Sequence, residues 1–168
     1  GNTIKSFKKA IFLGVDMVDL EVHYKDGELY TLHDINRWNI ETPTLSQIIE
    51  VVNHRVKINI ELKGSNTAKP VAELIRKYIS LGWTFEDFLI SSFKFEELEA
   101  FRKFCPEVKI GVLIRRDSGE YLEMAKKLKA FFINVSIDIV QKDGKIVKKL
   151  HELGYKVFVW TVNSPKKI

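Results

Sequence analysis

The sequence predicts an α/β protein built as a β/α barrel, and three observations support this fold class. Short runs typical of strands recur between amphipathic stretches typical of helices, from residue 3 to residue 162. The connections between these runs are short, which favours parallel strands joined by right-handed crossovers. A doubly wound nucleotide-binding sheet has the same rhythm, but it should carry a glycine-rich turn after an early strand, and none is present.

Local signals mark where the elements begin and end. Glycines at positions 14, 82 and 154 follow helical stretches, and Pro43 precedes one that Thr42 or Thr44 could cap. The alternation gives six helices and six strands. The expected elements are helix 3–13, strand 17–24, turn 25–27, extended segment 28–32, helix 43–54, strand 56–63, helix 68–81, strand 88–92, helix 95–104, strand 108–114, helix 119–129, strand 132–135, helix 139–153 with an interruption near 142–144, and strand 156–162.

Length and composition predict one domain, spanning residues 1–168, with 45% hydrophobic and 29% charged residues. No apolar run approaches the roughly 20 residues of a membrane span. The net charge of +5 comes from lysines scattered along helical stretches, so the sequence does not indicate a nucleic-acid-binding surface. Cys105 is the single cysteine, which excludes an internal disulfide and fits a cytoplasmic location.

The strand expected at 17–24 places ionisable residues on one face. Asp19, Glu21 and His23 alternate with apolar residues, and the following turn leads to His33. A solvated edge strand would show the same alternation. Two neighbouring carboxylates repel each other unless a cation lies between them, so a carboxylate pair near an imidazole indicates a metal and an acid/base group.

The strand expected at 56–63 repeats this pattern with Asn59, Glu61 and Lys63 on one face. Asp19, Glu21 and Glu61 could jointly hold one divalent cation, and an all-oxygen ligand set favours Mg²⁺ or Ca²⁺. Lys63 could neutralise a phosphoryl oxygen, and His33 could transfer protons. The alternative is an internal ion pair between Glu61 and Lys63.

Other candidates lie near the ends of later strands. Trp160, beside Phe158, could form the wall of a small-molecule pocket, although aromatic residues at such positions are more often plain core. Ser92 and Asn163 lie at or just past strand ends, where barrel enzymes assemble their active sites. These three are candidate substrate-binding residues.

At this point the sequence resembles the glycerophosphodiester phosphodiesterase family. The residues that carry the resemblance are Asn2-Thr3, the block from Gly14 to Val22, Lys25-Asp26-Gly27, His33-Asp34, Pro43-Thr44-Leu45, Asn59 to Lys63, Ser91-Ser92-Phe93 and Trp160 to Asn163. The resemblance implies a TIM-type (β/α)8 barrel that hydrolyses glycerophosphodiesters to glycerol 3-phosphate and an alcohol with a divalent cation. It assigns Asp19, Glu21 and Glu61 to the metal, His33 to acid/base catalysis and Lys63 to the phosphate.

The chain also departs from the family pattern. The first strand with its His-Arg-Gly and the last strand and helix have no counterpart, and Gly1 replaces a glutamate of the Pro-Glu-Asn-Thr motif. The Glu-x-Asp pair is inverted to Asp19-x-Glu21, and 35–42 is shorter than the corresponding family segment. We therefore expect this sequence to be part of a longer chain.

Two alternative functions stay open at this stage. The departures permit a non-catalytic relative that binds a phosphodiester or a metal. A related phospholipase D-type barrel enzyme is less consistent, because it would require an apolar interfacial loop and secretory cysteines. The alcohol headgroup, the metal and the oligomeric state are not specified by the sequence.

Overall fold

The computed structural model describes residues 2–116 and 119–162, and it divides into two compact units at Lys109 and Ile110. The first unit contains four strands and the second contains three. The candidate residues Asp19 to Ser92 belong to the first unit, and Trp160 belongs to the second. Asn163 lies outside the described residues. The organisation of residues 1–168 as a single domain stays a prediction.

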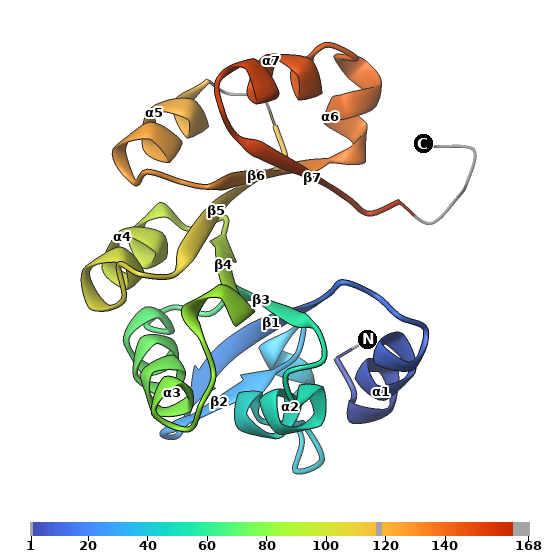
Figure 1. Ribbon diagram of the computed structural model, residues 1–168, viewed down its shortest axis with the longest axis vertical. Helices are drawn as coiled ribbons and strands as arrows, with labels where there is room; N and C mark the ends of the chain where they lie inside the picture. Colours follow the sequence, from blue (N-terminus) through green and yellow to red (C-terminus); the bar gives the residue numbers. More distant parts are fainter. Residues whose placement is uncertain (1, 117–118, 163–168) are drawn as a thin grey trace. The chain divides into compact units, whose positions relative to one another are not determined.

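The strands of the first unit are β1 (Met17–Lys25), β2 (Glu28–Thr31), β3 (Lys57–Leu62) and β4 (Phe88–Ser92). They are ordered β2-β1-β3-β4 (Figure 1). β1 pairs with β3 and β3 with β4 in parallel, whereas β2 folds back antiparallel on the end of β1. The tight turn at Asp26 and Gly27, both at positive φ, allows this hairpin.

The helices of the first unit are, in chain order, α1 (Ile4–Phe12), η1 (Ile35–Arg37), α2 (Leu45–Val52), α3 (Ala68–Ser80), η2 (Phe85–Asp87) and α4 (Phe95–Phe104). The α-helices among them cover the apolar face of these strands. The side chains of Leu20, Val22, Ile58 and Ile60 are almost fully buried. With one face packed in this way, the polar residues of β1 and β3 project from the opposite face.

Two capping boxes set the starts of α1 and α2. Thr3 and Ser6 exchange side-chain and backbone hydrogen bonds at the start of α1, and Thr44 does the same with Gln47 at the start of α2. Of the two threonines that could cap α2, Thr44 is therefore the cap. α2 ends at Asn53, which adopts the left-handed conformation.

The second unit is a parallel sheet of β5 (Lys109–Ile114), β6 (Phe132–Ser136) and β7 (Lys156–Trp160). Helix α5 (Glu120–Lys127) connects β5 to β6, and α6 (Ile137–Lys142) and α7 (Ile146–Glu152) connect β6 to β7 (Figure 1). β5 and β6 are thus each followed by helical structure and a parallel neighbour, as in the β/α units that the sequence predicts.

The predicted elements are confirmed, but the count of six helices and six strands is wrong. The described residues contain seven strands and seven α-helices, besides the short 3₁₀ helices η1 and η2. The segment after the first turn pairs fully enough to be strand β2, and the stretch 139–153 divides into α6 and α7 at Asp143. No helix of the described chain has the length and apolar character needed to cross a membrane.

Candidate active site

Polar side chains form two rows across the face of the first sheet that the helices leave open. Glu21, Glu61 and Ser91 are register partners on β1, β3 and β4. Asp19 and Asn59 are partners two residues earlier on β1 and β3. Because these positions share a face, the alternation in the sequence places carboxylates side by side on neighbouring strands.

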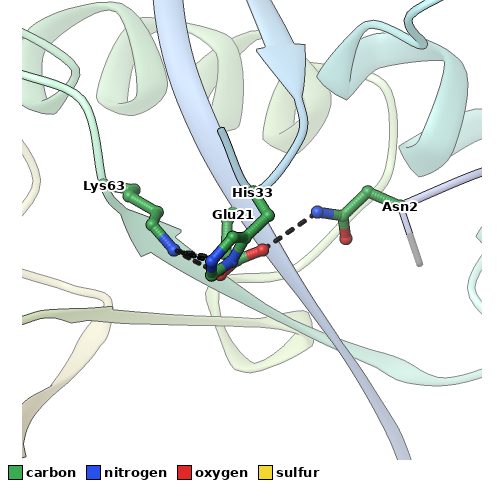
Figure 2. Close-up of polar contacts among 4 residues, drawn as sticks. All are labelled: Asn2, Glu21, His33 and Lys63. Atoms are coloured by element: carbon green, nitrogen blue, oxygen red, sulfur yellow. Dashed lines mark hydrogen bonds and ion pairs between the residues drawn. The ribbon is translucent and has the colours of Figure 1, made fainter. Parts of the chain in front are cut away.

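A cluster of three charged or ionisable groups forms around Glu21. Oε1 of Glu21 lies 2.7 Å from Nζ of Lys63 and 2.6 Å from Nδ1 of His33. Nζ of Lys63 is also 2.8 Å from the same ring nitrogen, and Asn2 donates to Oε2 of Glu21 at 3.0 Å (Figure 2). Three predicted site residues, from β1, the segment after β2 and the end of β3, are therefore in direct contact.

Backbone hydrogen bonds explain why these three segments meet. The N–H of Leu32 donates to the carbonyl of Glu21 at 3.0 Å, which brings His33 back over β1. The N–H groups of Lys63 and Gly64 both donate to the carbonyl of Val22, at 3.3 and 3.0 Å, which extends the β1–β3 pairing past the end of β3. The hydrogen bonds thus bring His33, which follows β2, and Lys63, which follows β3, to the same carboxylate oxygen of Glu21.

The pKa of the Glu21 carboxyl reflects two opposing effects. Partial burial would raise the pKa, but hydrogen bonds from Lys63, His33 and Asn2 outweigh it and hold the pKa below its ordinary value. Glu21 is therefore anionic at neutral pH. Its side chain is only 22% exposed, whereas the side chain of His33 is 73% exposed. The imidazole is the member of the cluster that is open to an incoming molecule.

Asp19 has a different environment. Loss of hydration within the sheet raises the pKa of its carboxyl, even though much of its surface is accessible, and a hydrogen bond with the Asn59 side chain only partly offsets this effect. The Oδ1 atom of Asn59 is buried and has no hydrogen-bond partner among the described residues, and the same holds for Oγ of Ser91. Buried polar atoms normally have partners, so this face has unused capacity for hydrogen bonding or ligation.

A hollow of about 730 Å³ opens beside the cluster. Glu21 and His33 line it together with Asn2, Arg37 and Thr42, among other residues. Its size lies within the range of small-molecule sites. The segment 35–42, between His33 and α2, forms much of its wall.

The other predicted residues have surroundings of their own. The hydroxyl of Ser92 is fully buried, and it donates to the carbonyl of Leu62 at 2.6 Å and accepts from the N–H of Lys94 at 3.0 Å.

Trp160 donates from Nε1 to the carbonyl of Asn134 at 3.2 Å, with the Arg115 guanidinium 5.9 Å from the centre of its ring. Glu61 is half-buried and directly beside Glu21 in the register.

Two contributors to the site, Asn2 and Ser91, were not among the predicted site residues, and His23 was placed on this face without a role. Asn2 belongs to a motif that the sequence analysis quotes, yet its contact with Glu21 depends on where α1 begins. Ser91 precedes the serine that the sequence favours, and only the register with Glu61 identifies it. Burial lowers the pKa of His23, and its Nδ1 lies 3.1 Å from where a Cβ on Gly64 would be. The strand alternation already placed His23 on this face.

The donor atoms of this face are chemically suited to a hard divalent cation, because they are carboxylate, amide and hydroxyl oxygens. Their present placement does not form a complete set of ligands. Across residues 2–116 and 119–162, no three His, Cys, Asp or Glu side chains lie close enough together to hold a metal ion. In this arrangement the cation next to Glu21 is the ammonium of Lys63.

The sequence is similar to a described protein family and to curated proteins. A model of the glycerophosphoryl diester phosphodiesterase family matches residues 35–168. Glycerophosphodiester phosphodiesterases of Caldanaerobacter subterraneus and Bacillus altitudinis are 28% and 27% identical. These alignments cover 96% and 99% of this chain and 80% and 82% of the relatives. They span 202 and 205 positions against 168 residues here, so the relatives contain residues without a counterpart in this chain.

Solved structures agree with the fold. An Oleispira antarctica phosphodiesterase in complex with the product sn-glycerol-3-phosphate has a TM-score of 0.84 and 21% identity, covering 99% of this chain and 81% of that chain. A glycerophosphodiester phosphodiesterase from Parabacteroides distasonis has a TM-score of 0.80 and 22% identity, covering 98% and 79%. The α/β fold class predicted from the sequence, a TIM-type (β/α)8 barrel, is confirmed.

Proposed function

Because the chain belongs to the glycerophosphoryl diester phosphodiesterase family, we propose that it hydrolyses glycerophosphodiesters to glycerol 3-phosphate and an alcohol. The observation that carries this proposal is the contact of Glu21 with both His33 and Lys63 beside an open hollow. A phosphodiester needs a cation for its phosphoryl oxygens and a proton donor for the departing alcohol. The cluster provides one group for each task.

Lys63 supplies the positive charge. Its ammonium has three donors, of which Glu21 takes one, so it can also donate to a non-bridging phosphoryl oxygen. Charge placed in advance where negative charge develops stabilises the transition state, and this electrostatic effect is usually the largest one. Glu21 holds the ammonium in position.

His33 supplies the proton. We assign the proton on Nδ1 to the hydrogen bond with Glu21, because an anionic carboxylate is an acceptor only. The ammonium of Lys63, which is a donor only, then donates to Glu21 and to the substrate instead of to Nδ1. Nε2, on a side chain that is 73% exposed, gives its proton to the leaving alkoxide as a water oxygen bonds to phosphorus and the ester P–O bond breaks. The proton that this water loses passes to the same imidazole, which restores the starting state.

We also propose that the activity depends on a divalent cation, Mg²⁺ or Ca²⁺. Asp19, Glu21 and Glu61 would hold it, with Asn59 and Ser91 as neighbouring oxygen donors. A hard cation bound there would withdraw charge from the phosphoryl oxygens. Trp160, Ser92 and Asn163 remain proposed substrate-binding residues, and a cytoplasmic location remains a proposal from the single cysteine.

The test is release of glycerol 3-phosphate from glycerophosphocholine, measured with Mg²⁺, with Ca²⁺ and with EDTA. We expect release with at least one metal and none with EDTA. His33→Ala should abolish release, whereas His151→Ala, which removes an exposed histidine on α7, should leave it unchanged. Release that EDTA does not affect would contradict metal dependence, and equal activity of the two histidine variants would contradict the role of His33.

A non-catalytic relative that binds a phosphodiester or a metal is the second candidate, because the cation next to Glu21 in this arrangement is the ammonium of Lys63. Such a protein would be stabilised thermally by a metal or a phosphodiester without turnover. A rise in Tm with glycerophosphocholine, together with no glycerol 3-phosphate under any metal condition, would establish binding in place of hydrolysis. Cleavage of sphingomyelin in place of glycerophosphocholine would indicate the phospholipase D-type activity.

A further inference from the structure

Glu97 is a buried carboxylate that the proposed reaction does not use. It lies on α4, and the residue is 6% exposed. It accepts hydrogen bonds from the N–H groups of Asn66, Thr67 and Ala68 at 2.6, 3.0 and 2.9 Å, and from the hydroxyl of Thr67 at 3.0 Å. Bonds to an ionised acceptor are shorter and stronger than bonds between neutral groups. Glu97 therefore fixes the segment that follows Lys63.

This carboxylate also occupies the start of α3. The first N–H groups of a helix have no partners within the helix, and they attract an anion or a capping side chain. Thr67 precedes α3 but makes no side-chain capping bond. Glu97 supplies the missing acceptor from another helix. The positive end of α3 is thus matched by a protein anion.

The backbone on both sides of Lys63 is held by buried hydroxyl groups. The carbonyl of Leu62 accepts from Oγ of Ser92 at 2.6 Å. The single hydroxyl proton of Thr67 is shared between the carbonyl of Gly64 at 3.1 Å and Oε2 of Glu97 at 3.0 Å. Ser92 and Thr67 are both fully buried. Thr67 in turn makes two bonds with Glu97, so the chain of contacts runs from α4 to the residue next to Lys63.

We propose that Glu97 is a positioning residue for Lys63, acting through Thr67 and the backbone of Gly64. A lysine side chain is flexible, so the place of its ammonium depends on where the backbone starts it. A displacement of 1 Å in a reacting group can reduce the rate about 100-fold. Without Glu97, the segment after Lys63 would relax, and the 2.7 Å contact between Lys63 and Glu21 would lengthen. The catalytic consequence rests on the function proposed above.

Two matched pairs of variants test this role. Glu97→Gln weakens the acceptor, and Glu96→Gln removes the same charge from the exposed neighbouring residue. Thr67→Val removes the hydroxyl with little change in shape, and Thr67→Ser keeps it. We expect Glu97→Gln and Thr67→Val to lower kcat/KM for glycerophosphocholine about 10-fold or more. The controls Glu96→Gln and Thr67→Ser should keep a kcat/KM close to that of the unaltered protein. All assays are run at a temperature well below the Tm of every variant.

A double-mutant cycle separates positioning from general stability. In a Lys63→Met background, Glu97→Gln and Thr67→Val should cause no further loss of kcat/KM, because the group that they position is gone. An equal loss in both backgrounds would overturn the proposal. If Glu97→Gln does not fold, the Thr67 pair decides the question alone.

A second measurement does not require turnover. The ring signals of His33, read by NMR of histidine-labelled protein, report on the nearby ammonium of Lys63. The chemical shifts of these signals should change in Glu97→Gln and Thr67→Val and should remain unchanged in Glu96→Gln and Thr67→Ser. Unmoved signals in the folded Thr67→Val variant would overturn the positioning role. Absence of turnover in the unaltered protein would refute only the proposed function, and the NMR result would still decide the role of Glu97.

Discussion

Lys63 donates to Glu21 at 2.7 Å across the β1–β3 pairing, although 42 positions separate the two residues in the chain. The sequence analysis left Glu61 as the alternative ion-pair partner of Lys63. The structure shows Glu21 in contact with the ammonium, within reach of His33. A lysine held between a carboxylate and an imidazole is positioned to donate a hydrogen bond to an anionic ligand. The first prediction follows from this contact.

Lys63→Met should lower kcat for glycerophosphocholine hydrolysis by roughly 100-fold or more, the usual loss when one preorganised donor to a developing oxyanion is removed. Lys63→Arg should recover only part of the activity, because a planar guanidinium does not reproduce the point contact with Glu21. Steady-state kinetics measure both effects. Lys148→Met is the control, since that side chain is 82% exposed on α7. Comparable losses at positions 63 and 148 would contradict a specific role for Lys63.

Thr44→Ala should lower the free energy of unfolding by about 1 kcal/mol, the typical value for loss of an N-cap. The Thr44 hydroxyl accepts from the N–H of Gln47 at 3.2 Å, and the Gln47 side chain accepts from the N–H of Thr44 at 2.9 Å. Thr44→Ser retains the acceptor and should stay within a few tenths of a kcal/mol. Urea unfolding of the three proteins gives the comparison. A Ser variant as unstable as the Ala variant would show that the methyl group matters more than the cap.

Gly111→Ala should destabilise the protein by about 1–3 kcal/mol, because overpacking a filled core forces side chains and backbone to shift. Gly111 on β5 is the register partner of Phe132 on β6, and a Cβ at this position would overlap the phenyl ring. Phe132 is fully buried and packs against Phe158, with ring centroids 5.0 Å apart, so the ring has nowhere to move.

Gly144→Ala is the matched control for Gly111→Ala. A Cβ there would meet nothing within 4 Å, so its effect should stay within about 0.5 kcal/mol. Thermal unfolding monitored by circular dichroism distinguishes the two variants. A Gly111→Ala protein as stable as the control would mean that the ring of Phe132 can be displaced without loss.

Cys105 should make stability fall at alkaline pH. Burial raises the pKa of its thiol from 9.0 to about 11. As the pH rises above 9, the Cys105 thiol ionises in the unfolded chain before it ionises in the folded protein. The stabilisation that comes from this difference is therefore complete below pH 9 and is lost as the pH rises through 11. One pKa unit corresponds to about 1.4 kcal/mol. Between pH 8 and pH 11 the unaltered protein should therefore lose roughly 2 kcal/mol more of its free energy of unfolding than Cys105→Ala loses.

Urea unfolding of the unaltered protein and of Cys105→Ala, at pH 8, 9, 10 and 11, measures this difference. The Ala variant should be less stable at pH 8 because it creates a cavity, so the quantity to compare is the slope of stability against pH. Tyr78, whose pKa is raised mainly by burial, is present in both proteins, so its contribution cancels. Parallel stability curves would show that the thiol ionises equally in both states.

The sequence by itself determined the elements and the face that each one buries. The ends of β4 and α4 agree with the predicted ranges, because apolar period and terminal residues are local signals. The same local alternation placed Asp19, Glu21 and His23 on one face of β1 and Glu61 and Lys63 on one face of β3. Fold class and candidate chemistry both followed from these short patterns.

Only the tertiary structure decided which of these residues meet. The parallel register of β1 and β3 and the hairpin return of β2 bring Glu21, His33 and Lys63 together. The same register identifies Ser91 as the neighbour of Glu61, while Ser92 points to the backbone of Leu62. A one-residue shift along a strand exchanges its two faces, and nothing in the alternation of a single strand fixes its partner's register.

Glu97 shows most clearly that the sequence alone does not decide which side chains and backbone groups meet. In the sequence it is one of two adjacent acids at the start of α4, where both would support the helix dipole equally well. Packing of α4 against the segment before α3 buries Glu97 and leaves Glu96 exposed. The sequence therefore determined what each element is, and the pairing of distant backbone donors and acceptors decided what each side chain can do.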